Sequence, residues 1–162
     1  MRMNEVELTA DLFVAFIDGI QNRKNVKTYY KMYDEEFEKR FVFEERFDEV
    51  ISLVIRLFGD TLKKSNFRKP ALFYALFLAL YNLKYNIAGL PKSVLTNKNE
   101  KSEAKIKYCL DRIEEIIEAG ADELDKRQSD FYISISRATS DGESRKIRTK
   151  YIVEELNRTF SD

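Results

Sequence analysis

The chain has 162 residues, of which 44% are hydrophobic and 35% are charged, with equal numbers of basic and acidic residues. This length suits one domain over 1–162, and a globule of this size buries roughly 70% of its unfolded surface, so a core forms without disulfides or metals. The zero net charge excludes a global electrostatic attraction to nucleic acid, and the low content of Gly and Pro indicates a helix-rich protein.

Apolar side chains at helical spacing predict three helices in the first part of the chain. The first is expected to begin near Thr9, which can cap it, and to contain Gly19 within its length. The second covers about 26–37 and the third about 43–58, where Gly59 is a good stop residue. Their apolar stripes are Leu12, Phe13, Phe16, Ile17 and Ile20; Val26, Tyr29, Tyr30, Tyr33 and Phe37; and Phe43, Phe47, Val50, Ile51, Val54, Leu57 and Phe58.

A fourth helix, about 70–86, begins at Pro70 and contains the unbroken apolar run 71–81. Because it is apolar on all sides, the rest of the fold must enclose it. The run is too short to cross a bilayer, which takes roughly 20 apolar residues. We therefore expect a central core helix that contacts the first, third and fifth helices through four almost fully buried side chains: Phe73, Leu76, Phe77 and Leu80.

The second half of the chain predicts three further helices. One follows the polar loop 92–101 and buries Ile106, Cys109, Leu110, Ile113, Ile116 and Ile117. The segment 121–138 alternates apolar and polar residues like a strand, but one strand without a partner leaves its backbone groups unpaired, so we interpret it as a helix. The last, about 143–158, is expected to bury Ile147, Tyr151, Ile152 and Leu156. The predicted fold class is all-α: a single-domain bundle of six or seven helices around the central apolar helix.

The chain contains no histidine and one cysteine, Cys109. These counts exclude Ser-His-Asp and Cys-His catalysis, histidine general bases, the usual zinc sites and thiolate metal clusters. Phosphate-loop and dinucleotide fingerprints are missing as well. Cys109 lies in an apolar stripe, which favours a buried structural thiol. We predict no catalytic residue, metal site, cofactor or membrane partner, and the lack of a signal peptide indicates a cytoplasmic protein.

Carboxylates are the remaining candidates for catalytic residues. An acidic cluster on the second and third predicted helices could bind Mg²⁺ or Mn²⁺, and the alternative function is therefore a metal-dependent hydrolase. The simpler interpretation is a solvated acidic face between two apolar stripes. The cluster consists of Asp34, Glu35, Glu36, Glu38, Glu44, Glu45, Asp48 and Glu49.

Basic residues form two groups along the chain. The first lies between Asp60 and Glu100, where no acidic residue occurs, and the second lies near the C-terminus. If the two groups converge, they form a positive surface for phosphate or for an acidic partner; the alternative is ordinary solvated side chains and local ion pairs. The residues expected to contact nucleic acid or a partner are Arg68, Lys69, Arg145, Lys146 and Arg148.

Five segments of the chain together resemble one family. They are 7–24, 29–40, 45–59, 67–91 and 136–152, and the most specific is FRKPALFYALF, which begins at Phe67. They resemble the helical C-terminal part of the ParB-like domain-of-unknown-function proteins. That family includes the GmrSD-type, modification-dependent restriction systems and related phage-defence proteins.

The resemblance implies an accessory domain and not a catalytic one. In that family the nucleotide-hydrolysing, DNA-processing chemistry belongs to an N-terminal ParB/sulfiredoxin-like domain with an Asp-Gly-Gln-Gln-Arg type motif, which does not occur here. The His-Asn-His nuclease domain of many relatives is likewise absent, so no active-site residue carries over. The resemblance implies a non-catalytic interaction domain, present as a fragment or a stand-alone relative. Such a domain would pack against the ParB-like nucleotide-hydrolysing domain or parent protein, form a homo-oligomer, or hold DNA.

Overall fold

The computed structural model describes residues 3–22, 28, 40–94, 100–120, 124–136 and 141–161. Every regular element in these ranges is helical, which confirms the all-α prediction, and no described helix is long and apolar enough to cross a membrane. The helix expected over 26–37 lies outside the described residues, apart from Thr28. The elements are α1 (Met3–Asp18), α3 (Arg40–Phe58), the 3-10 turns η2 (Gly59–Lys63) and η3 (Asn66–Arg68), α4 (Pro70–Tyr85), α5 (Glu100–Ala119), α6 (Lys126–Ser136) and α7 (Gly142–Ser161).

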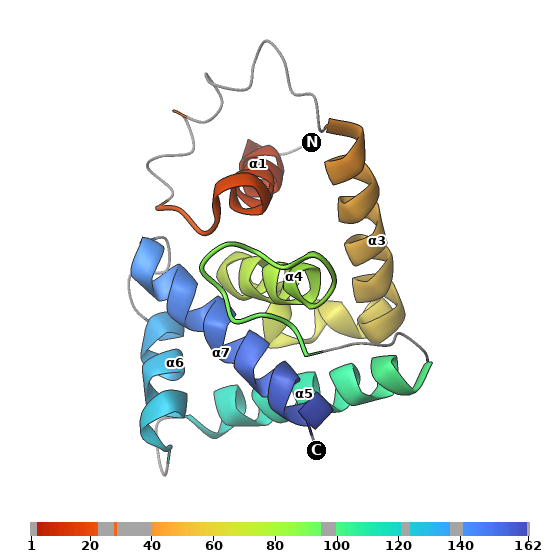
Figure 1. Cartoon of the computed structure of the whole chain (residues 1–162). Coiled ribbons are helices and arrows are strands. Elements are labelled where there is room, and N and C mark those ends of the chain that lie inside the picture. Colours follow the sequence, from red (N-terminus) through yellow and green to blue (C-terminus); the bar gives the residue numbers. More distant parts are fainter. Residues whose placement is uncertain are drawn as a thin grey trace.

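The helix α4 lies at the centre of the molecule. Figure 1 shows α1 above it, α3 at its right, α5 below it and α7 across its front, with α6 on the outer side of α7. Every side chain from Tyr74 to Leu83 is buried, so α4 is enclosed on all sides, as its apolar composition requires. Its main neighbours are α7, α3 and α1, and α7 covers it more extensively than α5 does.

Aromatic rings form the contact between α4 and its two N-terminal neighbours. Phe16 of α1 stacks on Tyr81 with ring centres 4.0 Å apart, and Phe47 of α3 lies 5.0 Å from Phe77. Phe77 is fully buried, as predicted, and so are Leu76 and Leu80. The prediction for Phe73 was wrong, because its side chain is only partly buried. Its ring lies 6.2 Å from that of Phe77.

The helix α1 differs from the prediction at both ends. It begins at Met3, well before the predicted cap Thr9, and Gly19 follows the helix instead of lying inside it. Gly19 has φ +77°, a left-handed conformation that commonly ends helices. A Cβ atom at this position would lie 2.8 Å from the carbonyl oxygen of Ala88, in the turn after α4. Only glycine therefore allows the end of α1 to approach the end of α4 so closely.

A polar side chain inside α4 fixes the turn that follows the helix. Asn82 is fully buried, its Nδ2 donates to the carbonyl of Pro91 at 2.9 Å, and its Oδ1 accepts from the backbone of Ile87 at 2.7 Å. The buried amide is satisfied on both sides, as an interior polar group must be. The turn over 86–91 is thereby held against the core.

The two C-terminal helices agree with the prediction in type but differ in their buried faces. The segment 126–136 is a helix, with Phe131 fully buried against Tyr151 of α7 at a ring distance of 4.3 Å. On α7, Ile147 is 38% exposed although it was expected to be buried, while Arg145 and Arg148 point inward. Sequence reasoning assigned the arginines to the wet face because charged residues are seldom buried without a partner.

Removing the ring of Phe77 should destabilise the fold strongly. Phe77→Ala leaves a cavity between α1, α3 and α4, so we expect the free energy of unfolding in urea to fall by about 3–5 kcal/mol. Phe41→Ala is a matched control because Phe41 is 80% exposed, and in dilute protein it should change stability by less than about 0.5 kcal/mol. Equal losses for the two variants would contradict the central position of α4.

Candidate functional site

Arg145 lies in the interior of the molecule. Its side chain is 7% exposed, and its Nη2 donates to Oδ2 of the buried Asp11 on α1 at 2.9 Å. Its Nη1 donates at 3.3 Å both to Oδ1 of the same carboxylate and to the carbonyl of Gln21. The guanidinium also stands over the ring of Tyr74, 4.7 Å from its centre. This bidentate pair fixes α1 on α7, which is a structural role.

Arg148 is fully buried and connects α7 to α6. Its Nη1 donates to the carbonyl of Ser134, in the last turn of α6. The last four carbonyls of a helix have no partner within it, and a cation near them is favoured by the helix dipole. Burial lowers the pKa of the Arg148 guanidinium, and the neighbouring Arg145 lowers it further.

Three of the five predicted contact residues lie on the surface. Lys69 donates to the side chain of Asn66 at 2.8 Å, and Arg68 donates to the carbonyl of Lys63 at 3.1 Å, so both bond to their own η2–η3 connection. Lys146 is exposed on α7 and lies 3.6 Å from Glu143. The burial of Arg145 and Arg148 leaves Arg68, Lys69 and Lys146 as the candidates for contact with a partner.

The acidic cluster divides between described and undescribed parts of the chain. Asp34, Glu35, Glu36 and Glu38 lie outside the described residues. Of the described members, Glu44 pairs with Arg40 at 2.7 Å, and Glu49 pairs with Lys84 and accepts from the hydroxyl of Tyr85. Among the described residues, no group of three or more carboxylate or thiol side chains is arranged to hold a metal ion.

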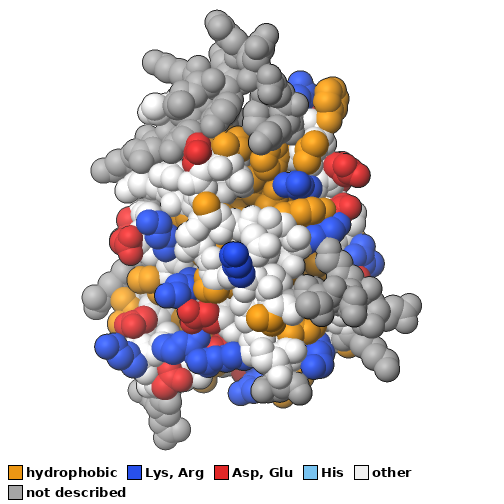
Figure 2. All heavy atoms as spheres, in the orientation of Figure 1, with side chains coloured by type: hydrophobic (Ala, Val, Ile, Leu, Met, Phe, Trp, Pro, Cys, Tyr) orange, Lys and Arg blue, Asp and Glu red, His pale blue; other side chains and the backbone are white. Residues whose placement is uncertain are grey.

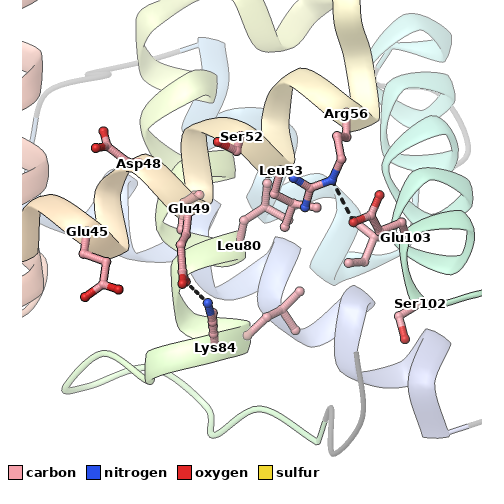
Figure 3. Close-up of a pocket in the computed structure, with 13 residues that line it drawn as sticks. Glu45, Asp48, Glu49, Ser52, Leu53, Arg56, Leu80, Lys84, Ser102 and Glu103 are labelled. Atoms are coloured by element: carbon pink, nitrogen blue, oxygen red, sulfur yellow. Dashed lines mark hydrogen bonds and ion pairs between the residues drawn. The ribbon is translucent and has the colours of Figure 1, made fainter. Parts of the chain in front are cut away.

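A trough of about 840 Å³ lies between α3, α4 and α5 (Figure 3). One stripe of α3 forms its long wall, and the opposite wall comes from the end of α4 and the start of α5. A volume of this size is typical of sites for small molecules. The lining consists of Glu45, Asp48, Glu49, Val50, Ser52, Leu53 and Arg56 from α3, Leu80, Leu83 and Lys84 from α4, and Ser102, Glu103 and Ile106 from α5.

Two ion pairs join the walls of this trough. Lys84 pairs with Glu49, and Arg56 pairs with Glu103, whose Oε1 accepts from Nε at 2.9 Å. Burial lowers the pKa of the Lys84 amine, an effect that the charge of Glu45 opposes. Figure 3 shows Glu45 and Glu49 on the side of α3 that faces Lys84, while Asp48 projects from the other side of the helix. The carboxylates are therefore spread along the trough and do not converge on one point.

Sequence reasoning did not find this trough. Its α3 wall is the polar side of an amphipathic helix, and such a side is usually solvated. The spacing of the wall residues, at 45, 48, 49, 52, 53 and 56, does indicate one face of a helix. No local sequence pattern shows that α4 and α5 lie opposite this face of α3 and make the surface concave.

Cys109 is a buried thiol and takes no part in this trough. It is 4% exposed on the inner face of α5, as the sequence predicts. Burial raises its pKa to about 11, so the thiol stays protonated at neutral pH and is a poor nucleophile.

The Asp11–Arg145 pair should contribute to stability and not to contact with a partner. Arg145→Met leaves the Asp11 carboxylate buried without its cation, so we expect the free energy of unfolding to fall by about 3–5 kcal/mol. The neighbouring Lys146→Met, at an exposed position, should change it by less than about 0.5 kcal/mol. Asp11→Asn with Arg145→Met should cost less than the sum of the single changes, as expected for residues in contact. Additive costs in urea unfolding would contradict the pairing.

No protein-family model, curated protein or solved structure matches the chain. The resemblance to the ParB-like family therefore depends on the five sequence segments alone. What that resemblance implies about activity and partners stays a prediction.

Proposed function

We propose that this chain is a non-catalytic helical interaction domain that packs on another protein surface through the start of α3. The observation that carries the proposal is a pair of adjacent apolar side chains: Phe41 is 80% exposed and Val42 is 45% exposed. A phenyl ring in water is unfavourable, and contiguous exposed apolar surface is typical of sites of protein contact.

Aromatic surface continues from this pair toward α1. Phe13 of α1 and Phe47 of α3 stack with ring centres 5.6 Å apart, and both are only partly buried. Figure 2 shows hydrophobic side chains gathered at the upper right, over the start of α3 and between α3 and α1. A partner that covers Phe41 would also extend the aromatic layer that these two helices share.

The family resemblance gives this contact a partner. In a ParB-like, GmrSD-type system the accessory helical domain would pack against the nucleotide-hydrolysing domain, or against a second copy of itself. The proposal places the chain in the cytoplasm, in a restriction or phage-defence protein. DNA would then be a further contact, and the exposed Arg68, Lys69 and Lys146 are the side chains on the described surface that we assign to it.

The packing proposal predicts an association that depends on Phe41. We expect the wild-type chain to form dimers, or a complex with a purified ParB-like domain, and we expect Phe41→Glu to abolish this association because it places a charge in an apolar contact. The molar mass measured by sedimentation equilibrium over a wide concentration range tests both partners. Ile133→Glu is the matched control, since Ile133 is an exposed apolar residue on α6, away from α3.

Two results would contradict the packing proposal. One is a wild-type chain that stays monomeric at every concentration and forms no complex with the ParB-like domain. The other is an equal loss of association in Phe41→Glu and Ile133→Glu, which would show that the start of α3 has no special role.

The DNA contact predicts a salt-dependent affinity that is lost with specific cations. We expect Arg68→Glu with Lys69→Glu to weaken binding to duplex DNA and to reduce the salt slope by about 0.9 for each phosphate contact removed. Arg112→Glu with Lys126→Glu changes the net charge equally at other exposed positions and should have less effect. Undetectable binding at low salt, or equal losses in both double variants, would remove DNA from the proposal.

A further inference from the structure

The helix α3 carries a second stripe of residues beside the one that it buries in the core. Positions 41, 44, 48, 51 and 55 repeat at intervals of three and four, so they share one face over about 21 Å of helix. This outer stripe meets the trough only at position 48, which lies at the edge of both. Its members are Phe41, Glu44, Asp48, Ile51 and Ile55.

The two ends of the outer stripe are apolar and exposed. Phe41 is 80% exposed, Ile55 is 62% exposed, and Ile51 between them is partly buried. Apolar residues at intervals of three and four form the seam through which one helix packs on another. Because α3 already covers α4 with a different stripe, these two side chains lie on a face that the described helices leave uncovered.

The middle of the outer stripe is acidic. Glu44 pairs with Arg40 at 2.7 Å, so its charge is compensated within the same helix. Asp48 is exposed and forms no ion pair with any residue that the structure describes. Figure 3 shows that Asp48 projects from the side of α3 away from Lys84. A helix lying along the stripe therefore meets one uncompensated carboxylate halfway between two apolar contacts.

A second copy of this chain fits the outer stripe poorly. In a parallel pair of stripes each residue faces its own copy. In the antiparallel pair that sets Phe41 against Ile55, the midpoint is residue 48. Both arrangements place two Asp48 carboxylates face to face, and like charges directly opposite each other are unfavourable. A basic side chain at the centre of the partner's stripe makes the same contact attractive.

We propose that the outer stripe binds an amphipathic helix of another protein, with a basic residue in the middle of its apolar face. The apolar residues of this helix cover Phe41 and Ile55, and its Lys or Arg donates to the carboxylate of Asp48. The inference rests on the protein contact proposed for the start of α3. It extends that contact along three further turns of the helix and selects a different protein over a second copy as the partner.

Titration of the ¹⁵N-labelled full chain with two designed helical peptides tests the site by NMR. Each peptide has about 20 residues and apolar side chains at intervals of three and four, and the two differ only in a central Lys or Glu. We expect the Lys peptide to bind at least about fivefold more tightly, because an ion pair replaces a contact between like charges. The shifted amides should lie within 41–55.

Reversing the charge of the protein should reverse this preference. We expect Asp48→Lys to bind the Glu peptide more tightly than the Lys peptide. Glu115→Lys is the matched control, because it makes the same charge change at an exposed position of α5. That variant should keep the wild-type preference. No binding of either peptide, equal affinities for the two, or a reversal in Glu115→Lys as well would overturn the inference.

The two apolar ends separate this inference from the packing proposal. We expect Phe41→Glu and Ile55→Glu each to weaken binding of the Lys peptide about tenfold or more, while Ile133→Glu on α6 has no effect. A loss in Phe41→Glu alone would overturn the outer stripe and leave the contact at the start of α3 in place. No loss in either variant would contradict both. Circular dichroism should show that all three variants keep their helix content.

Removing the central charge should permit self-association. We expect Asp48→Leu to form a dimer in sedimentation equilibrium, and Asp48→Leu with Ile55→Glu to lose it, because the repulsion at the midpoint is gone only in the first variant while the apolar ends remain. A wild-type dimer that depends on Ile55 would overturn the inference, since the occupant would then be a second copy. An Asp48→Leu chain that stays monomeric would also contradict the role given to this carboxylate.

Discussion

Covering an apolar helix on every side is the constraint on which the rest of the structure depends. A surface helix offers one apolar stripe, so α4 needs several neighbours that approach from different directions, and α1, α3 and α7 supply them. Each meets α4 differently: α1 and α3 pack through aromatic rings around Phe77 and Tyr81, and α7 crosses α4 and covers it most extensively (Figure 1). The helices α5 and α6 complete the fold by packing against α7.

The buried arginines show how a strongly charged helix can serve as the main cover of the core. Arg145 and Arg148 bring guanidinium groups into the interior, where desolvation is costly. The cost is offset because each donates to a fixed acceptor, the Asp11 carboxylate for Arg145 and the Ser134 carbonyl for Arg148. Apolar residues could fill these positions, but they would not distinguish one placement of α1 and α6 from another. The two arginines bond α7 to a fixed carboxylate of α1 and a fixed carbonyl of α6.

Periodicity predicted the existence and type of the described helices other than α6, and the enclosure of α4. The helix α6 was predicted against its strand-like alternation, because a single strand would have no partner. Periodicity failed where a contact with a distant part of the chain decides whether a residue is buried or where a helix ends. Ile147 was expected to be buried and is exposed, whereas Arg148 was expected to be exposed and is buried. Arg148 can be buried because the carbonyl of Ser134 on α6 accepts its hydrogen bond. The requirement for glycine at position 19 could be recognised only with knowledge of Ala88, far away in the sequence. The trough was missed because concavity is a property of three helices together, while sequence patterns describe one helix at a time.

The bond from Arg148 to the end of α6 also bears on the order in which the fold assembles. With 11 residues, α6 is shorter than the roughly 12–15 residues at which isolated helices become even marginally stable in water. Its main contacts are with α7, which follows it in the chain. The helix α6 therefore depends on a segment synthesised after it, and we expect its backbone amides to become protected from hydrogen exchange only once α7 packs against it.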